Sequence, residues 1–317
     1  MCASTETRKL ANSEQMNHRF KFTAMGSPCQ LCLSSVDRGK AEAVASAMIG
    51  EIARIEAKYS RYRPDSTLSQ VNRVAGRGAS VELDPETAAI IDYAYACYRK
   101  SGGLFDVSAG CLRLAWDFSE ARLPDSHQVE LILQRVGLDK LHWEPPWLTF
   151  LASGMELDLG GIGKEYAVDR AIEICLEQGV NNGFIDLGGD IRVAGPQPDG
   201  SPWPIRVRHP RNADGFAACL SVATGAVATS GDYEKFIDVA GKRYCHILDA
   251  RSGWPVQGLA AVTVVADSCL VAGSVATIAM LKGRGGIAWL EELGVPHLWI
   301  DLEGRQGSKA LTETSAP

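Results

Sequence analysis

The fold assignment depends on "LDLGGIGKEYAVDRA", residues 157–171. An apolar approach ends in an acid and two glycines, and a lysine–glutamate pair then opens a helix that we predict from Lys164 to Gln178. A dinucleotide fingerprint needs G-x-G-x-x-G and a P-loop needs G-x-x-x-x-G-K-[ST], and neither pattern fits this stretch. Glycines still let a ligand approach the backbone, and a helix N-terminus offers free N–H groups to a phosphate. The residues of this stretch leave two interpretations open, a tight structural turn and a phosphate cradle.

The same four letters, Asp-Leu-Gly-Gly, recur at residues 186–189 inside "NGFIDLGGDIRVAG", which we predict to be a strand. Two such turns in one domain suggest two backbones that converge on one bulky ligand or on each other. Two further stretches are unusual, "ATSGDYEKF" (228–236) and "YCHILDARSGWPV" (244–256). The second contains His246, which could serve acid–base chemistry or bind a phosphate, or could be a structural strand histidine.

Helical and extended patterns alternate along the chain without a strict βαβ rhythm, which predicts an α+β or mixed α/β fold. Apolar spacing predicts a long amphipathic helix over 40–62. A second helix is predicted over 84–103, with Pro85 in its first turn and two glycines at its end. Asp65 or Ser66 is expected to cap a short helix between them. We predict one domain over 19–303, with disordered segments at 1–18 and 304–317.

Bulk composition narrows the classes of partner and compartment. The net charge of −6 and pI of about 5.6 argue against nucleic acid as the main partner. The sequence contains no run of about 18 apolar residues, so we expect no membrane-spanning helix. Nine scattered cysteines and a polar N-terminus without an export signal predict a cytoplasmic protein with reduced thiols. Cys29 and Cys32 form a lone CxxC in a strand-like run, where they would face opposite sides, which argues against a metal or redox site.

Taken together and in order, eight stretches between about Phe20 and Leu293 resemble the FAD:protein FMN transferase family. They are "AMGSP" (24–28), "SRYRPDSTLSQVNR" (60–73), "GGLFDVSAG" (102–110), "DLGGIGKEYAVDRA" (158–171), "DLGGDIRVAGPQPDGSPWPIRVRHPR" (186–211), "ATSGDYEKF" (228–236), "CHILDARSGWPV" (245–256) and "VAGSVATIAMLKG" (271–283). The resemblance implies a flavin-transferase-like fold with mixed sheets and packed helices, and a catalytic role for the single domain.

The resemblance also implies an activity and a set of site residues. Members of the family split FAD at its pyrophosphate, attach the FMN half to a Ser or Thr of an acceptor flavoprotein and release AMP, with the help of Mg²⁺. By motif match, FAD would contact Met25, Tyr62, Leu104, Phe105, Asp106, Gly160, Tyr166 and Ile247. Lys164 would lie beside the phosphates, although a solvated first-turn lysine is the alternative. His246 would lie next to the pyrophosphate, where it would transfer a proton or position a phosphate.

The implied metal site is where this chain departs from the family. The family binds Mg²⁺ through an Asp and a Thr of an Ala-Asp-Ala-x-x-Thr motif and through a backbone carbonyl after the first Asp-Leu-Gly-Gly-Ile. Here the carbonyl of Gly163 and Thr277 are present, but Gly273 stands where the family has the Asp. The family's usual Gly after the lysine is here Glu165, so either Glu165 or Asp267 could replace the lost carboxylate. The alternative is that Glu165 only complements the helix dipole.

Three functions are compatible with a metal site that keeps the family's Thr, at Thr277, but lacks the family's Asp, at Gly273. The first is FMN transfer to a protein hydroxyl. The second is an FAD pyrophosphatase, in which water attacks and FMN and AMP are released. The third is an FAD-binding or delivery protein that has lost the chemistry with the acidic ligand. The sequence leaves open the acceptor protein and the oligomeric state.

Overall fold

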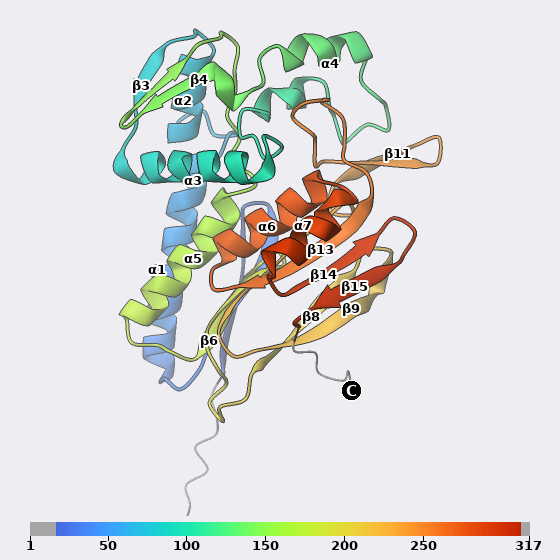
Figure 1. The fold of residues 1–317 in the computed structure, drawn as a ribbon. Coiled ribbons are helices and arrows are strands. Elements are labelled where there is room, and N and C mark those ends of the chain that lie inside the picture. Colours follow the sequence, from blue (N-terminus) through green and yellow to red (C-terminus); the bar gives the residue numbers. More distant parts are fainter. Residues whose placement is uncertain (1–16, 312–317) are drawn as a thin grey trace, which may run out of the picture.

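A computed structural model describes residues 17–311 of the chain. An antiparallel sheet of eight strands forms its centre, and helices cover one face of this sheet (Figure 1). The sheet order is β1-β2-β6-β7-β10-β13-β14-β15. The bounds are β1 (His18–Ala24), β2 (Ser27–Leu33), β6 (Gly183–Leu187), β7 (Asp190–Gly195), β10 (Gly225–Gly231), β13 (Leu259–Ala266), β14 (His297–Asp301) and β15 (Gln306–Lys309). The mixture of helices and antiparallel sheets confirms the predicted fold class.

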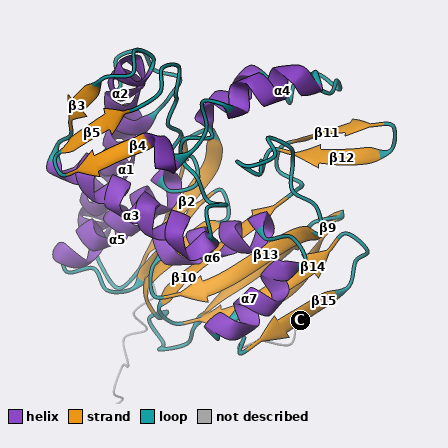
Figure 2. Cartoon of the chain, turned by 45° about the horizontal axis from the view of Figure 1, so that its top comes forward, coloured by secondary structure: helices purple, strands orange, loops and turns teal. Residues whose placement is uncertain are grey.

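Three small sheets and several helices complete the described part of the chain. One small sheet has three strands in the order β3 (Ser80–Glu82), β5 (Trp147–Phe150) and β4 (Leu141–Glu144). The other two are hairpins, β8 (Trp203–His209) with β9 (Asn212–Val222), and β11 (Phe236–Val239) with β12 (Lys242–Cys245). The helices are α1 (Arg38–Tyr59), α2 (Thr67–Ala75), α3 (Pro85–Ser101), α4 (Ser126–Leu133), α5 (Gly163–Glu177), α6 (Cys269–Leu281) and α7 (Gly285–Leu293), with short 3₁₀ turns η1 (Gly110–Leu114) and η2 (Leu138–Lys140). Figure 2 shows the β11–β12 hairpin extending away from the central sheet.

Local capping explains where the predicted helices begin and end. The Asp84 side chain accepts hydrogen bonds from the backbone N–H groups of Glu86 and Thr87 at the start of α3. Gly102 ends that helix in the left-handed conformation, at φ 70°. Ser66, one of the two caps expected from the sequence, accepts a hydrogen bond from the N–H of Ser69 at the start of α2. The predicted bounds of these helices are therefore confirmed to within a few residues.

The central sheet has a hydrophobic core on each face. The larger core lies between the sheet and helices α1, α5 and α6, and the smaller one lies under the β8–β9 hairpin. Fully buried side chains such as Met48 and Ile52 each stabilise such a core by about 1.5–3 kcal/mol. Cys29 packs into the first core and Cys32 into the second. The two cysteines therefore face opposite sides of the sheet, as the sequence predicts.

Two predictions of local structure are wrong. Residues 182–195 form not one strand but the hairpin β6–β7, because Gly188 and Gly189 adopt φ of 59° and 96° and turn the chain. The prediction of disorder after 304 is wrong for β15, which pairs with β14. Gly307 allows this pairing, since a Cβ there would lie 2.7 Å from Cζ2 of Trp299. At the N-terminus, residues 1–16 of the predicted disordered segment lie outside the described residues, and β1 already begins at His18.

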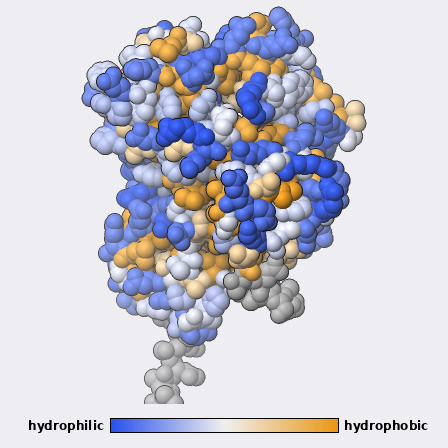
Figure 3. Space-filling view, viewed as in Figure 1, coloured by the Kyte–Doolittle hydropathy of each residue, from blue (hydrophilic) through white to orange (hydrophobic). Residues whose placement is uncertain are grey.

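None of the helices among residues 17–311 is a candidate membrane span. They are all too short or too polar to span a bilayer. Figure 3 shows hydrophilic and hydrophobic residues interspersed over the face that it displays, as is usual for the surface of a folded domain.

Candidate active site

The first Asp-Leu-Gly-Gly turn, residues 158–161, is held in place by its own aspartate. Oδ1 of Asp158 accepts a hydrogen bond of 2.9 Å from the N–H of Gly160, and Oδ2 accepts one of 2.6 Å from Nη1 of Arg61. The Phe105 ring packs on the turn, because a Cβ at Gly161 would lie only 3.3 Å from its Cζ. Gly160 itself is exposed. The turn is thus fixed from below by Phe105, while Gly160 leaves its backbone accessible to a ligand.

The second turn, residues 186–189, repeats this local chemistry between β6 and β7. Oδ1 of Asp186 accepts a hydrogen bond of 2.8 Å from the N–H of Gly189. Gly188 lies directly against the β1–β2 turn, since a Cβ there would be 2.8 Å from Cβ of Ser27. The β1–β2 turn, which contains Met25, therefore packs against the second turn. Met25 has a positive φ of 50°, and its N–H donates a hydrogen bond of 2.9 Å to Oε1 of Glu56.

An ion pair connects the two turns. Nζ of Lys164, in the first turn of α5, contacts Oδ2 of Asp190, the first residue of β7. The Asp190 side chain is only 4% exposed, whereas that of Lys164 is 28% exposed. Burial alone would lower the pKa of the Lys164 ammonium, but the attraction of the Asp190 carboxylate outweighs it and raises that pKa. Lys164 is thus a fixed positive charge at the N-terminus of α5 and not a solvated surface lysine.

Glu165 lies on the buried side of the same helical turn. Its side chain is 6% exposed, and its Oε2 has no hydrogen-bond partner. The carboxyl group lies against Gly273 of α6, where an added Cβ would be 2.5 Å from Cγ and 2.7 Å from Oε1 of Glu165. Burial, and then repulsion by Asp190, raise the pKa of Glu165 to about 8. A buried carboxylate oxygen without a partner is costly, so this position calls for a cation or a proton.

The other implied metal ligands lie on the elements that meet at Glu165. Thr277 follows Gly273 by four residues on α6, and therefore lies on the same helix face one turn further along. Its Oγ1 is 2.7 Å from Oγ of Ser230 on β10. Gly163 begins α5 two residues before Glu165. Asp267, the alternative carboxylate, is exposed and lies directly before the N-cap of α6, six residues along the chain from Gly273.

These donors suit a hard cation, although they are not an acidic cluster. Among residues 17–311, no three or more His, Cys, Asp or Glu side chains are grouped as a metal site. Mg²⁺ takes oxygen ligands and uses few carboxylates. The unpartnered oxygen of Glu165, the Thr277 hydroxyl and the Gly163 carbonyl are oxygens of the required kind. The chemistry of these donors therefore fits the ion that the sequence motifs imply.

His246 lies at the end of β12, next to the β10–β11 connection. Its Nδ1 is 3.1 Å from the carbonyl oxygen of Lys235, and its backbone N–H donates to the same oxygen at 2.9 Å. The protein atoms around the ring disfavour its charged form, and the positive charges of Lys235 and Lys164 add to this, so the pKa of His246 is lowered from 6.5. Since a carbonyl only accepts hydrogen bonds, Nδ1 carries the proton and Nε2 of the neutral ring is left as an acceptor.

Of the other residues implied to contact FAD, Tyr62 is linked to the first turn through Arg61. Tyr62 is 77% exposed, and its hydroxyl accepts a hydrogen bond of 3.0 Å from Arg61, the partner of Asp158. Leu104 is buried and borders a shallow hollow that Arg251 and Lys282 also line. Ile247 is half-buried against the larger core, and its carbonyl accepts a hydrogen bond of 3.0 Å from the N–H of Val256.

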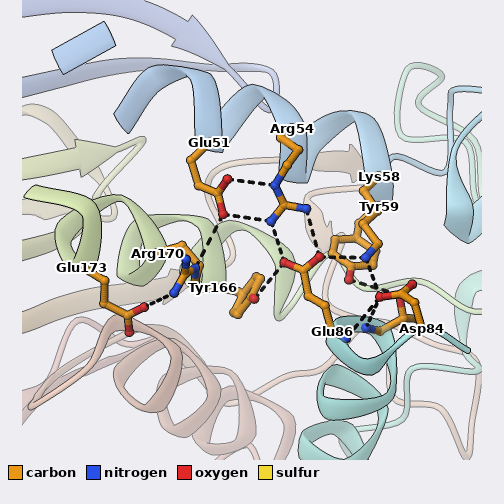
Figure 4. Close-up of polar contacts among 10 residues, drawn as sticks. Glu51, Arg54, Lys58, Tyr59, Asp84, Glu86, Tyr166, Arg170 and Glu173 are labelled. Atoms are coloured by element: carbon orange, nitrogen blue, oxygen red, sulfur yellow. Dashed lines mark hydrogen bonds and ion pairs between the residues drawn. The ribbon is translucent and has the colours of Figure 1, made fainter. Parts of the chain in front are cut away.

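Two of the implied residues are committed to contacts within the protein. The Asp106 carboxylate accepts hydrogen bonds from the N–H and Oγ of Ser108 and from the N–H of Leu138, which tie down the loop after α3. The Tyr166 hydroxyl donates a hydrogen bond of 2.9 Å to Oε1 of Glu86, within the network that Figure 4 shows. Both side chains are thus held by partners other than Lys164 and Asp190.

The charged network around Glu86 clamps three helices together. Glu86, in α3, accepts hydrogen bonds from Arg54 and Lys58 of α1 and from Tyr166 of α5 (Figure 4). The guanidinium of Arg54 contributes most to lowering the pKa of Glu86 to about 2. The network therefore fixes α5, whose first turn carries Lys164, against the rest of the helical layer.

Several residues that shape the site lie inside the quoted stretches, but the stretches do not identify them as site residues. Asp190 is the buried partner of Lys164, and Ser230 is the partner of Thr277. An aspartate directly after the second Asp-Leu-Gly-Gly was a visible signal, but spacing could not show that it pairs across 26 residues with Lys164. Arg61 is similarly remote from Asp158 in sequence. Long-range pairs of this kind depend on the fold and not on local pattern.

Comparisons with known proteins identify relatives of this chain. A sequence profile described as the ApbE family matches residues 25–299. The FAD:protein FMN transferase of Klebsiella pneumoniae (strain 342) is 32% identical over 268 residues, which cover 81% of this chain and 80% of that protein. The protein of the same name from Vibrio cholerae serotype O1 is 31% identical over 257 residues, which cover 78% of this chain and 76% of that protein.

Solved structures show the same overall fold. The crystal structure of the ApbE protein from Thermotoga maritima is similar to this chain with a TM-score of 0.86 at 29% identity, and covers 93% of this chain and 97% of that one. The flavin transferase ApbE from Vibrio cholerae is similar with a TM-score of 0.81 at 25% identity, and covers 93% and 98% respectively. The likeness therefore extends over nearly the whole of each chain.

Proposed function

This chain belongs to the ApbE family, and we propose that it is an FAD:protein FMN transferase. Such an enzyme splits FAD at its pyrophosphate and joins the FMN half to a Ser or Thr hydroxyl of an acceptor flavoprotein. The hydroxyl oxygen forms a bond to the phosphorus of FMN, the bond from that phosphorus to the bridging oxygen breaks, and AMP leaves. The hydroxyl proton passes to a base.

The observation that carries this proposal is the joining of the two glycine turns by Lys164 and Asp190. Phosphoryl transfer depends on held reactants and on positive charge near the reacting phosphates. The first turn offers exposed backbone at Gly160, next to Gly161, which packs on the Phe105 ring, and α5 begins shortly after the turn. The partial positive charge of a helix N-terminus adds to the ammonium of Lys164. Asp190 keeps that ammonium in place.

His246 is the residue that we assign to the proton. Its neutral ring has a free Nε2, because Nδ1–H is held by the Lys235 carbonyl. A base of lowered pKa is already neutral at pH 7, and can take the proton of an attacking hydroxyl without first losing its own. Lys164, at the start of α5, is among the positive charges that lower the pKa of His246.

Magnesium dependence is part of the proposal. Glu165, Thr277 and the Gly163 carbonyl would hold the ion, and a bound Mg²⁺ would supply charge neutralisation to the phosphates. The acceptor is proposed to be a flavoprotein with a Ser or Thr flavinylation site. The scattered cysteines support the cytoplasm as the site of action, which remains part of the proposal.

The proposal is tested by mass spectrometry of an acceptor protein. The enzyme is incubated with FAD, MgCl₂ and an apo-flavoprotein that carries FMN on a threonine in its mature form. We expect the intact mass of the acceptor to rise by one FMN less one water, and an acceptor with valine in place of that threonine to stay unmodified. Release of FMN and AMP with an unmodified acceptor, or unchanged FAD, would contradict the proposal.

A further inference from the structure

The contact between Glu165 and Gly273 joins two helices at a point where side-chain volume is limiting. A Cβ at residue 273 would lie 2.5 Å from Cγ and 2.7 Å from Oε1 of Glu165. Separations under about 3 Å from a Cβ essentially never occur, so any larger residue at 273 would displace the Glu165 side chain. The glycine therefore makes room for the carboxyl group, so the side chain that fits at 165 depends on the residue at 273.

The Glu165 carboxyl group occupies this space, but one of its oxygens has no hydrogen-bond partner there. Its side chain is nine-tenths buried, and Oε2 has no hydrogen-bond partner. A glutamate that only complemented the dipole of α5 would not need to be buried against a neighbouring helix. Helix α6 presents the Thr277 hydroxyl one turn beyond Gly273. An unpaired buried carboxylate oxygen, with a hydroxyl one helical turn from the glycine that it packs against, is a partial ligand set for a hard cation.

We propose that this chain supplies the carboxylate ligand of a divalent-cation site from α5, through Glu165, and that Gly273 on α6 is the matching change that accommodates it. The carboxylate fills the space that a side chain at 273 would otherwise occupy. Asp267 is not the donor, because it is exposed and lies before the N-cap of α6. The inference rests on the proposed function for its biological purpose, but metal binding itself can be measured without any transfer reaction.

Mg²⁺ binding to reciprocal variants tests the inference. The thermal unfolding midpoint is followed against MgCl₂ at constant ionic strength, with and without FAD, and Mn²⁺ affinity is measured by titration calorimetry. The variants are Glu165→Ala, the exchange Glu165→Gly with Gly273→Asp, and the control Glu177→Ala. Glu177 is an exposed residue at the end of the same helix. Circular dichroism spectra establish that each variant is folded.

We expect Glu165→Ala to weaken cation binding by roughly tenfold or more, and Glu177→Ala to leave it unchanged. The exchange variant returns a carboxylate to the same space from α6, and we expect it to bind within tenfold of the wild type. Equal cation affinity of the wild type and Glu165→Ala, or no cation-dependent stabilisation of the wild type, would overturn the inference. Cation binding that depends on Glu165 without FMN transfer would instead refute only the proposed function.

Discussion

Replacing Lys164 by methionine is the sharpest test of the pair that joins the two glycine turns. The substitution keeps an unbranched chain but removes the charge that faces Asp190, whose side chain is only 4% exposed. Removal of one partner of a buried ion pair costs about 3–5 kcal/mol, because the other charge is left uncompensated. Since Lys164 keeps 28% of its side-chain exposure, we expect a loss near the lower limit, about 3 kcal/mol of unfolding free energy at pH 7.

The pH dependence of this loss has a definite sign. Burial raises the pKa of Asp190, and without Lys164 nothing of comparable size opposes that rise. The folded variant would then hold a proton that the unfolded chain, with a pKa near 3.9, has released. The deficit is therefore complete above the raised pKa of folded Asp190, and shrinks as the pH falls through it toward about 4.

Urea denaturation followed by tryptophan fluorescence at pH 7 and pH 5 measures the effect. The charge-free pair Lys164→Met with Asp190→Asn serves as control, and we expect it to recover part of the loss because no buried charge remains. Asp190→Asn alone should cost less than Lys164→Met, since the ammonium that it leaves behind reaches solvent. A loss below about 1 kcal/mol at pH 7, or one that grows on acidification, would refute the buried ion pair.

Three further perturbations follow from the same structure. Gly273→Ala places a methyl group 2.5 Å from Cγ of Glu165, so we expect the free energy of unfolding in urea to fall by about 1–3 kcal/mol. Adding Glu165→Gly should restore part of this loss. Unchanged stability of Gly273→Ala would show that the two helices are not tightly packed there. Glu86, with a pKa of about 2, should stabilise the fold by about 1–3 kcal/mol above pH 4.5 and lose this contribution between pH 4.5 and 2. The difference in unfolding free energy between wild type and Glu86→Gln checks this, and a difference that does not vary over that range contradicts it. His246→Ala should lower the rate of FMN transfer by about 10²–10⁴-fold. The wild-type rate should fall as the pH drops below the lowered pKa of His246, because the protonated ring cannot act as a base. A wild-type rate that does not vary with pH would exclude His246 as the base.

The sequence is sufficient for most of the helical layer, because local signals determine it. Asp84, Pro85 and Gly102 delimit α3 through a cap, a fixed φ and a left-handed terminus, and each acts within a few residues. The apolar spacing of α1 similarly predicts a buried stripe, which includes Met48 and Ile52. Where local chemistry determines an element, its bounds follow from the letters alone.

Strand pairing was harder to predict, because it depends on distant partners. The stretch around Gly188 and Gly189 has a continuous apolar pattern on both sides, and only the two left-handed glycines divide it into β6 and β7. β15 carries no apolar pattern, and it exists because β14 offers an edge and Gly307 fits under Trp299. Neither feature is visible in a window of a few residues.

The candidate site shows the same division. Ordered motifs were enough to name Lys164, Glu165 and His246, but not the Asp190 carboxylate that holds the lysine or the carbonyl that holds the histidine. The exchange of a family carboxylate at 273 for one at 165 was a hypothesis from two departures in sequence. The structure places those two residues in contact, which is the physical condition for such an exchange.

In the proposed reaction, FMN passes from FAD to a protein hydroxyl at this site. The most direct test is the ratio of AMP released to FMN bound covalently to the acceptor, measured in one reaction by chromatography and by intact mass. A transferase predicts one AMP for each flavinylated acceptor, with no free FMN and no AMP release when the acceptor is left out. AMP formed together with free FMN, at a rate that does not depend on the acceptor, would contradict the claim.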